Sequence, residues 1–234
     1  MNGCSLIACL CLEAALAAAG GEFPARASAA RPPRSVGSPT AQVRRCADTL
    51  KRTLMRRYPR WSPEADAQAS EVQRVIDETL DFDEIARRTL GPRWDALSSE
   101  QRRTFTSLLQ RLIERRPFDR SLRIDRDSTI AFQPESVAQR EAVVHSTVTT
   151  VSLGKETRRT VEYRLYLHDD RWRVYDIVVN GVSLVDNYRD QFAKIITRES
   201  FEGLLQRMRR KLGEGYGMGG ALAPGDGFDA PRAQ

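Results

Sequence analysis

Residues 172–192 read WRVYDIVVNGVSLVDNYRDQF, and this stretch decides how the chain is expected to fold. Its first half, 172–179, is rich in valine and aromatic residues, which favours a β-strand. Its second half has apolar residues three and four positions apart, which is the spacing of a helix. Gly181 lies between the halves, and glycine adopts the backbone angles of a sharp turn without strain. The stretch therefore predicts a strand that turns directly into a helix.

Four residues of this stretch are expected to hold the strand–helix junction in shape. Gly181 makes the turn, and the hydroxyl of Ser183 is expected to cap the following helix by accepting a backbone hydrogen bond. Asp176 interrupts an otherwise apolar strand, and a buried carboxylate is costly unless it is paired. We expect it to be paired inside the fold, with Arg189 as a candidate partner. The alternative is that Asp176 faces a cavity and acts there as a general base.

Helices are expected on both sides of a group of strands. Apolar residues on one helical face, together with start and stop residues, mark helices at 40–58, 62–80, 81–90, 98–116, 184–197 and 201–212. Beyond Pro117 the pattern changes to that of strands, at 129–132, 142–151, 160–168 and 172–179, the last three forming a meander. This order predicts an α+β fold, with helices packed on a strongly curved, mostly antiparallel sheet. Such a sheet leaves a concave apolar space.

Local signals predict several helix ends. Ser62 is expected as an N-cap in front of Pro63, because proline suits the first turn of a helix. Gly91, followed by a proline, is expected to stop a short helix. Ser98 and Gln101 have the spacing of a capping box, in which each side chain accepts a hydrogen bond from the other residue's backbone N–H.

A single domain is expected at residues 41–212. Residues 1–29 are largely apolar or small and offer small-x-small cleavage sites, which is typical of an export signal. A linker rich in proline, serine and arginine is expected at 30–40. The end of the chain, 213–234, is rich in glycine, alanine and proline, and we expect it to be disordered.

Composition and motifs argue against several classes of function. The net charge of +6 would suit nucleic acid, anionic lipid headgroups or an acidic protein. No nucleic-acid-binding motif is present, and neither are G-x-S-x-G, the phosphate-binding loop, G-x-G-x-x-G or H-E-x-x-H. Cys46 is the only cysteine of the expected domain, so no internal disulfide and no Cys/His zinc cluster can form there. The motif search therefore argues against an enzyme.

Five segments, in order along the expected domain, resemble the MlaC family, also called toluene-tolerance auxiliary proteins. Residues 172–192 resemble the family's WxVYDVxxxGxSLVxNYRxQF pattern. Residues 81–94 resemble FDFxxIxxxxLGxxW, 98–105 resemble xxxEQRxxF, 161–165 resemble xVxYRL, and 203–212 resemble the closing helix. The chain departs from the family at Pro117, which breaks the central helix.

The resemblance implies a periplasmic carrier of glycerophospholipid, with no catalytic residues and with no metal or organic cofactor. Such a carrier exchanges lipid with two partners, an outer-membrane lipoprotein–porin complex and an inner-membrane ABC transporter complex with its substrate-binding ring. Each buried CH₂ contributes about 0.8 kcal/mol, so two acyl chains outweigh the polar headgroup. The acyl chains are therefore expected in an apolar pocket, with the headgroup near solvent.

The expected pocket lies between the central helix, the strand before Gly181 and the helix after it. The pocket-lining candidates are the apolar residues Phe105, Leu109, Leu112, Val174, Ile177, Val179, Val182, Val185, Tyr188 and Phe192. A bulge in the strand would change which of its residues face the pocket.

Two other functions remain open from the sequence. The curved sheet resembles the cone of nuclear-transport-factor-like proteins, which hosts isomerases and hydratases that use a cavity aspartate, here Asp176. Basic helices could instead dock an acidic partner, which would make the chain a protein-interaction module.

Overall fold

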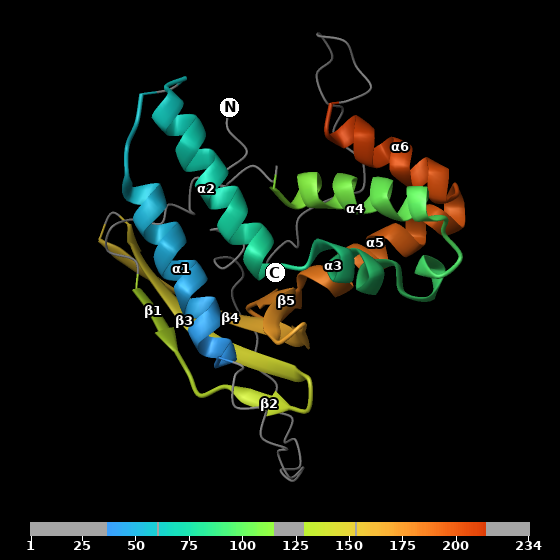
Figure 1. Ribbon diagram of the computed structural model, residues 1–234. Coiled ribbons are helices and arrows are strands. Elements are labelled where there is room, and N and C mark those ends of the chain that lie inside the picture. Colours follow the sequence, from blue (N-terminus) through green and yellow to red (C-terminus); the bar gives the residue numbers. More distant parts are fainter. Residues whose placement is uncertain (1–36, 60, 115–128, 153, 214–234) are drawn as a thin grey trace.

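The computed structural model describes residues 37–59, 61–114, 129–152 and 154–213 (Figure 1). Its elements in chain order are α1 (Pro39–Met55), α2 (Pro63–Thr79), α3 (Phe82–Leu90), a 3₁₀ turn (Gly91–Trp94), α4 (Ser99–Glu114), β1 (Thr129–Phe132), β2 (Ser136–Ala138), β3 (Glu141–Ser152), β4 (Lys155–His168), β5 (Arg171–Val179), β6 (Val182–Ser183), α5 (Leu184–Arg198) and α6 (Phe201–Lys211). The four expected strands and six expected helices are all present, and the short strands β2 and β6 are additional.

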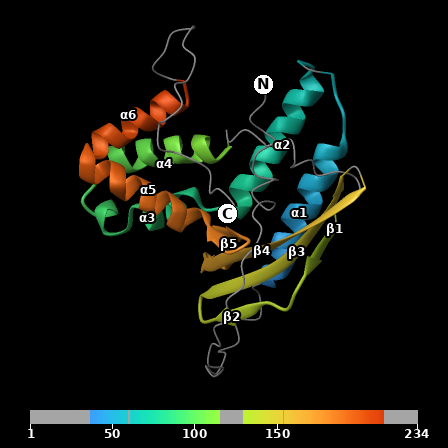
Figure 2. The ribbon, with the colours of Figure 1, turned by 180° about the vertical axis from the view of Figure 1, so that it is seen from behind.

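The described strands form one open sheet in which every paired neighbour is antiparallel. The strand order is β1-β3-β4-β5-β6, and β2 also pairs with β3. The sheet is long and twisted, with α1 and α2 beside it, while α3 to α6 gather in a group next to β5 (Figures 1 and 2). The predicted α+β fold, with helices on a curved antiparallel sheet, is confirmed.

A bulge in β5 decides which way its side chains point. Arg164 of β4 is opposite Asp176, but the next residue, Leu165, is opposite Val174, so Tyr175 is the extra residue of β5. Without this shift Val174 and Ile177 would lie on opposite faces, because side chains alternate along a strand. With it, both lie on the face that carries the buried residues of β4, which we call the inner face.

Gly181 turns β5 back on itself before the helix begins. Val179 pairs with Val182, and the two residues between them, Asn180 and Gly181, have φ angles of 45° and 84°. Asn-Gly is the preferred pair for a two-residue hairpin turn with both φ angles positive. The predicted direct passage from strand to helix is therefore wrong in one respect, since the strand β6 lies between them. Ser183 ends that strand and caps α5.

The local helix signals are confirmed. The Ser62 hydroxyl accepts from the N–H of Ala65 at 3.2 Å. Ser98 and Gln101 form the reciprocal capping box, with distances of 2.9 and 3.2 Å. Gly91 ends α3 with a φ of 58°, although the chain continues into a 3₁₀ turn.

One buried cluster connects the sheet to both groups of helices. Val144, Val161 and Leu165 of the inner face belong to it, and so do Val72 of α2 and Phe105 of α4. The strand–helix stretch at residues 172–192 joins the two groups of helices. Its β5 half contacts α2 and its α5 half contacts α3 and α6.

Three predicted segments lie wholly or mostly outside the described residues. They are the export signal at 1–29, the linker at 30–40, of which 30–36 lie outside, and the tail at 213–234, of which 214–234 lie outside. Pro117, the predicted end of the central helix, also lies outside them. Within the described ranges, no helix is both long enough and apolar enough to cross a membrane.

Candidate functional site

The ten predicted pocket residues lie in the interior of the fold. Nine are buried members of the single apolar cluster, and Val182 is half-buried on β6. Those on helices are Phe105, Leu109 and Leu112 of α4 and Val185, Tyr188 and Phe192 of α5. Those on β5 are Val174, Ile177 and Val179, which the bulge places together on the inner face. Their role as a lipid pocket stays a prediction.

Aromatic contacts bring the two helical sets together. The ring of Phe192 meets the ring of Phe105 edge to face at 5.6 Å between centroids, and it also contacts Tyr188 at 5.2 Å. Edge-to-face pairs of this kind contribute about 0.5–1.5 kcal/mol beyond their burial. Both phenylalanines are fully buried, so α4 and α5 are joined by packed rings.

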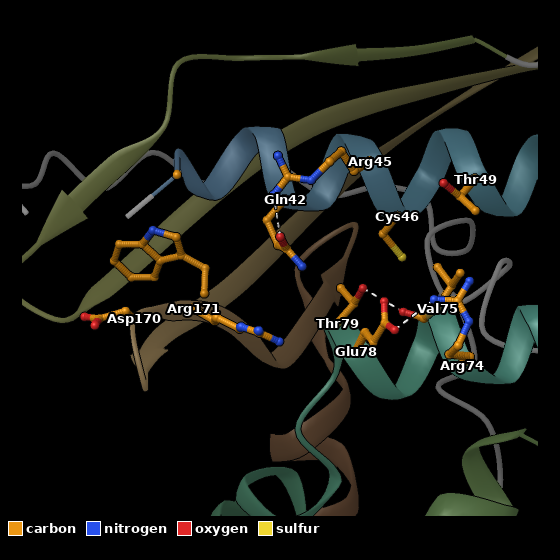
Figure 3. Close-up of a pocket in the computed structure, with 12 residues that line it drawn as sticks. Gln42, Arg45, Cys46, Thr49, Arg74, Val75, Glu78, Thr79, Asp170 and Arg171 are labelled. Carbon is orange, nitrogen blue, oxygen red and sulfur yellow. Dashed lines mark hydrogen bonds and ion pairs between the residues drawn. The ribbon is translucent and has the colours of Figure 1, made fainter. Parts of the chain in front are cut away.

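A pocket of about 440 Å³ lies elsewhere, between α1, α2 and the start of β5 (Figure 3). None of the ten predicted residues lines it. Its lining is rich in charged and polar groups: Gln42, Arg45, Thr49, Arg74, Glu78, Thr79, Asp170 and Arg171, with Gly37, Cys46, Val75 and Trp172. This pocket was not predicted from the sequence, because its residues come from three separate segments.

Two of the arginines in this pocket bond to neighbouring side chains of the lining. Arg74 pairs with Glu78 at 2.9 Å, and Arg45 donates to the side-chain oxygen of Gln42 at 2.6 Å. Cys46 points from α1 towards α2 (Figure 3), and burial raises the pKa of its thiol, opposed by a hydrogen bond with Thr79. The thiol is therefore protonated at neutral pH. Such a lining suits a polar or charged group rather than an acyl chain.

Asp176 is buried and fully engaged in the junction between β5 and α5. Its carboxylate accepts from the Ser183 hydroxyl at 2.6 Å and from the backbone N–H of Val185 at 3.0 Å. Arg164 of β4 donates a third bond at 3.2 Å. The Ser183 hydroxyl in turn accepts from the N–H of Asp186 at 3.0 Å, which is the predicted cap. Asp176 therefore ties the first turn of α5 to the sheet.

The predicted pairing of Asp176 with Arg189 is wrong. Arg189 donates to the carbonyl oxygen of Arg88 at 2.9 and 3.0 Å and to Asp186 at 2.6 Å, so it joins α5 to α3. The partner of Asp176 is Arg164, which lies directly opposite it in the sheet. Partial burial works to lower the pKa of Arg164, but the hydrogen bond to Glu162 and nearby carboxylates outweigh it and raise that pKa.

The arrangement argues against Asp176 as a catalytic base. Both of its oxygens accept hydrogen bonds from groups of the fold, and it does not line the polar pocket. A general base needs a free oxygen within reach of a substrate proton. Among the described residues, no three His, Cys, Asp or Glu side chains are grouped so that they could hold a metal ion.

The family model described as MlaC protein matches residues 44–210. The chain belongs to the MlaC family. The resemblance predicted from five sequence segments is thereby confirmed, and the match spans α1 to α6.

One solved structure shares the fold of this MlaC-family chain. It is the phospholipid-binding protein from Ralstonia solanacearum in complex with a phospholipid, which is 24% identical in sequence. The two structures align with a TM-score of 0.63 over 76% of this chain and 98% of that one. A search of the curated proteins gave no match.

Proposed function

We propose that this protein binds a glycerophospholipid and carries it through the periplasm. The observation that carries the proposal is membership of the MlaC family over residues 44–210. The solved protein with the same fold, which holds a phospholipid, supports it. The described residues contain no grouping of metal ligands, and the one conspicuous buried carboxylate serves the fold.

The acyl chains would be held where the inner face of the sheet meets the helices. Val174, Ile177 and Val179 of β5 share this face, and Tyr188 and Phe192 follow on α5. Each CH₂ moved out of water contributes about 0.8 kcal/mol, so apolar burial alone would hold two chains. Rearrangement of these side chains would have to make room for them, because interiors are closely packed.

The same proposal includes two partners and a compartment. The carrier would receive or deliver lipid at an outer-membrane lipoprotein–porin complex and at an inner-membrane ABC transporter complex with its substrate-binding ring. Its export would depend on the predicted signal at residues 1–29. A fusion of these residues to a reporter enzyme that is active only after export would test the compartment, and an inactive reporter would contradict it.

The lipid itself is tested by extraction. The full chain is produced in the periplasm of a Gram-negative host, purified without detergent, extracted with organic solvent and analysed by mass spectrometry. The expected result is co-purified phospholipid at close to one molecule for each protein. The absence of lipid from folded protein would contradict the proposal.

A matched pair of variants locates the lipid. Ile177→Phe adds a ring on the inner face, and Val178→Phe adds a ring on the opposite face of the same strand. Overpacking costs about 1–3 kcal/mol at either position, so stability falls in both. Only Ile177→Phe is expected to lower the lipid content. Equal lipid content in the two variants would place the acyl chains elsewhere.

A further inference from the structure

The exposed apolar side chains of this protein gather at one end of the molecule. In the described part of the chain, the large apolar residues that are exposed are Met55, Tyr58, Trp61 and Val151. The first three lie at the connection between α1 and α2. Val151 is near the end of β3, and this end of the strand lies beside the end of α1 (Figures 1 and 2). We call the described residues 51–59 and 61 the tip.

Trp61 is the most conspicuous of these residues. It is 80% exposed, whereas the other two tryptophans, Trp94 and Trp172, are buried. Its φ angle of 69° is in the left-handed region, which is unusual for a bulky residue and costs free energy. The backbone therefore holds a large apolar ring in water at an energetic cost, instead of turning it towards the core.

The tip is also strongly basic. Its described residues include the four basic residues Lys51, Arg52, Arg56 and Arg57 and no acidic one, and the acidic residues Glu64 and Asp66 follow in the first turn of α2. Arg56 pairs with Glu71 at 3.4 Å, and this pair is exposed and therefore weak. Arg57 is exposed and forms no ion pair with the described residues. The tip thus combines a tryptophan and a tyrosine with basic side chains.

We propose that the tip docks on the surface of an anionic lipid bilayer. Tryptophan and tyrosine favour the headgroup level of a membrane, where one end of the ring is apolar and the other wet. Basic side chains are attracted to the negative potential of anionic lipids. The tip is a connection that projects at the end of α1 and α2 (Figure 1), so it can enter a deformable interface. A stable protein partner would need about 800 Å² on each side, which a short projecting connection does not offer.

This docking goes beyond the proposed cargo and does not depend on it. It would place the carrier at a membrane surface before any exchange of lipid, with α1 and α2 foremost. Lipid extraction reads the cargo, whereas the following experiment reads the position of the protein on vesicles. Failure of one therefore leaves the other intact.

The test is flotation of the full chain with phosphatidylcholine vesicles, with and without phosphatidylglycerol. The protein is expected to float with the anionic vesicles and much less with the neutral ones. The emission of Trp61 is expected to shift to the blue on binding, because the two other tryptophans are already buried. Trp61→Ser should lower the partition coefficient about tenfold.

A pair of double variants with equal loss of charge provides the control. Arg56→Ser with Arg57→Ser removes two charges from the tip, and Lys194→Ser with Arg198→Ser removes two exposed charges from α5, away from the tip. The tip variant should bind at least about tenfold more weakly, since each basic residue near an anionic surface contributes about fivefold. The α5 variant should retain most of its binding.

Three outcomes of the vesicle experiments would overturn the proposal. They are absence of flotation with anionic vesicles, equal loss in the two double variants, and an unchanged emission of Trp61 on bound vesicles. Circular dichroism confirms that each variant is folded, which is expected because all of the substituted side chains are exposed. Tip-dependent binding to a purified membrane-complex protein, without any binding to vesicles, would likewise overturn it.

Discussion

The two faces of β5 differ in what they demand of a side chain. On the inner face, Val174 and Ile177 join the apolar cluster, where shape and volume matter and no directional bond is made. On the opposite face, Asp176 accepts three hydrogen bonds from Arg164, Ser183 and Val185. The inner face can pack against different apolar groups of similar volume. The hydrogen bonds of Asp176 on the opposite face, in contrast, fix the position of α5. One strand thus combines an apolar packing surface with a hydrogen-bonded joint.

The largest expected effect is at the polar face. Asp176→Ala would leave the Ser183 hydroxyl and the Val185 N–H buried without an acceptor, so the free energy of unfolding should fall by about 3 kcal/mol. Chemical denaturation measures it. Asp176→Asn retains an acceptor oxygen, so its free energy of unfolding should fall clearly less. A loss below about 1 kcal/mol in the alanine variant would show that the joint is not rigid.

The hairpin turn that brings Ser183 to Asp176 comes next. Gly181 has a φ of 84°, and a Cβ there would meet no atom within 4 Å, so Gly181→Ala costs only backbone strain. For an L-residue this strain is about 1–2 kcal/mol. Gly37→Ala is the matched control, since its Cβ would also meet open space and its φ is not positive. An equal fall in the thermal unfolding temperature of the two variants would contradict the assignment of backbone strain to position 181.

A smaller loss is expected on the inner face. Ile177→Val removes one methylene from a residue that is 3% exposed, which costs about 1 kcal/mol. The lipid content is expected to stay unchanged, because the pocket would gain room rather than lose it. Loss of the lipid from this variant, measured by mass spectrometry, would show that the inner face needs a defined shape after all.

The smallest expected effect is the coupling energy that distinguishes Arg164 from Arg189 as the partner of Asp176. In double-mutant cycles with Asp176→Asn, Arg164→Ala is expected to show a coupling of about 1 kcal/mol, modest because Arg164 is 35% exposed. Arg189→Ala should show coupling within about 0.5 kcal/mol of zero, since it bonds to Arg88 and Asp186 instead. Equal coupling energies for Arg164 and Arg189 would contradict the assignment of Arg164 as the partner of Asp176.

Interactions between near neighbours in the chain were the ones predictable from sequence. The caps at Ser62, Ser98 and Ser183 each bond to an N–H three residues on, so their spacing suffices. The partner of Asp176 was missed because it depends on a pairing twelve residues away and on a bulge. The Asn180-Gly181 pair is a local signal for the hairpin, since this pair favours a two-residue turn.

The burial of the predicted pocket residues could be read from the sequence, but their arrangement in space could not. Apolar periodicity selected residues that are indeed interior, and family motifs indicated a lipid carrier. Periodicity alone does not tell which buried residues can part to admit a ligand. The polar pocket between α1 and α2 needed the structure, because it is built from residues as distant as Arg45, Glu78 and Arg171.

By itself, the sequence determined the order of helices and strands, the family and the apolar character of the interior, since periodicity, caps and motifs are all local. The tertiary structure decided the facing of Val174 and Ile177, the pairing of Asp176 with Arg164 and the gathering of exposed apolar residues with basic ones at the tip. These features depend on strand register and on the packing of distant segments. The physical reason is that a one-residue shift in a sheet reverses every side chain beyond it.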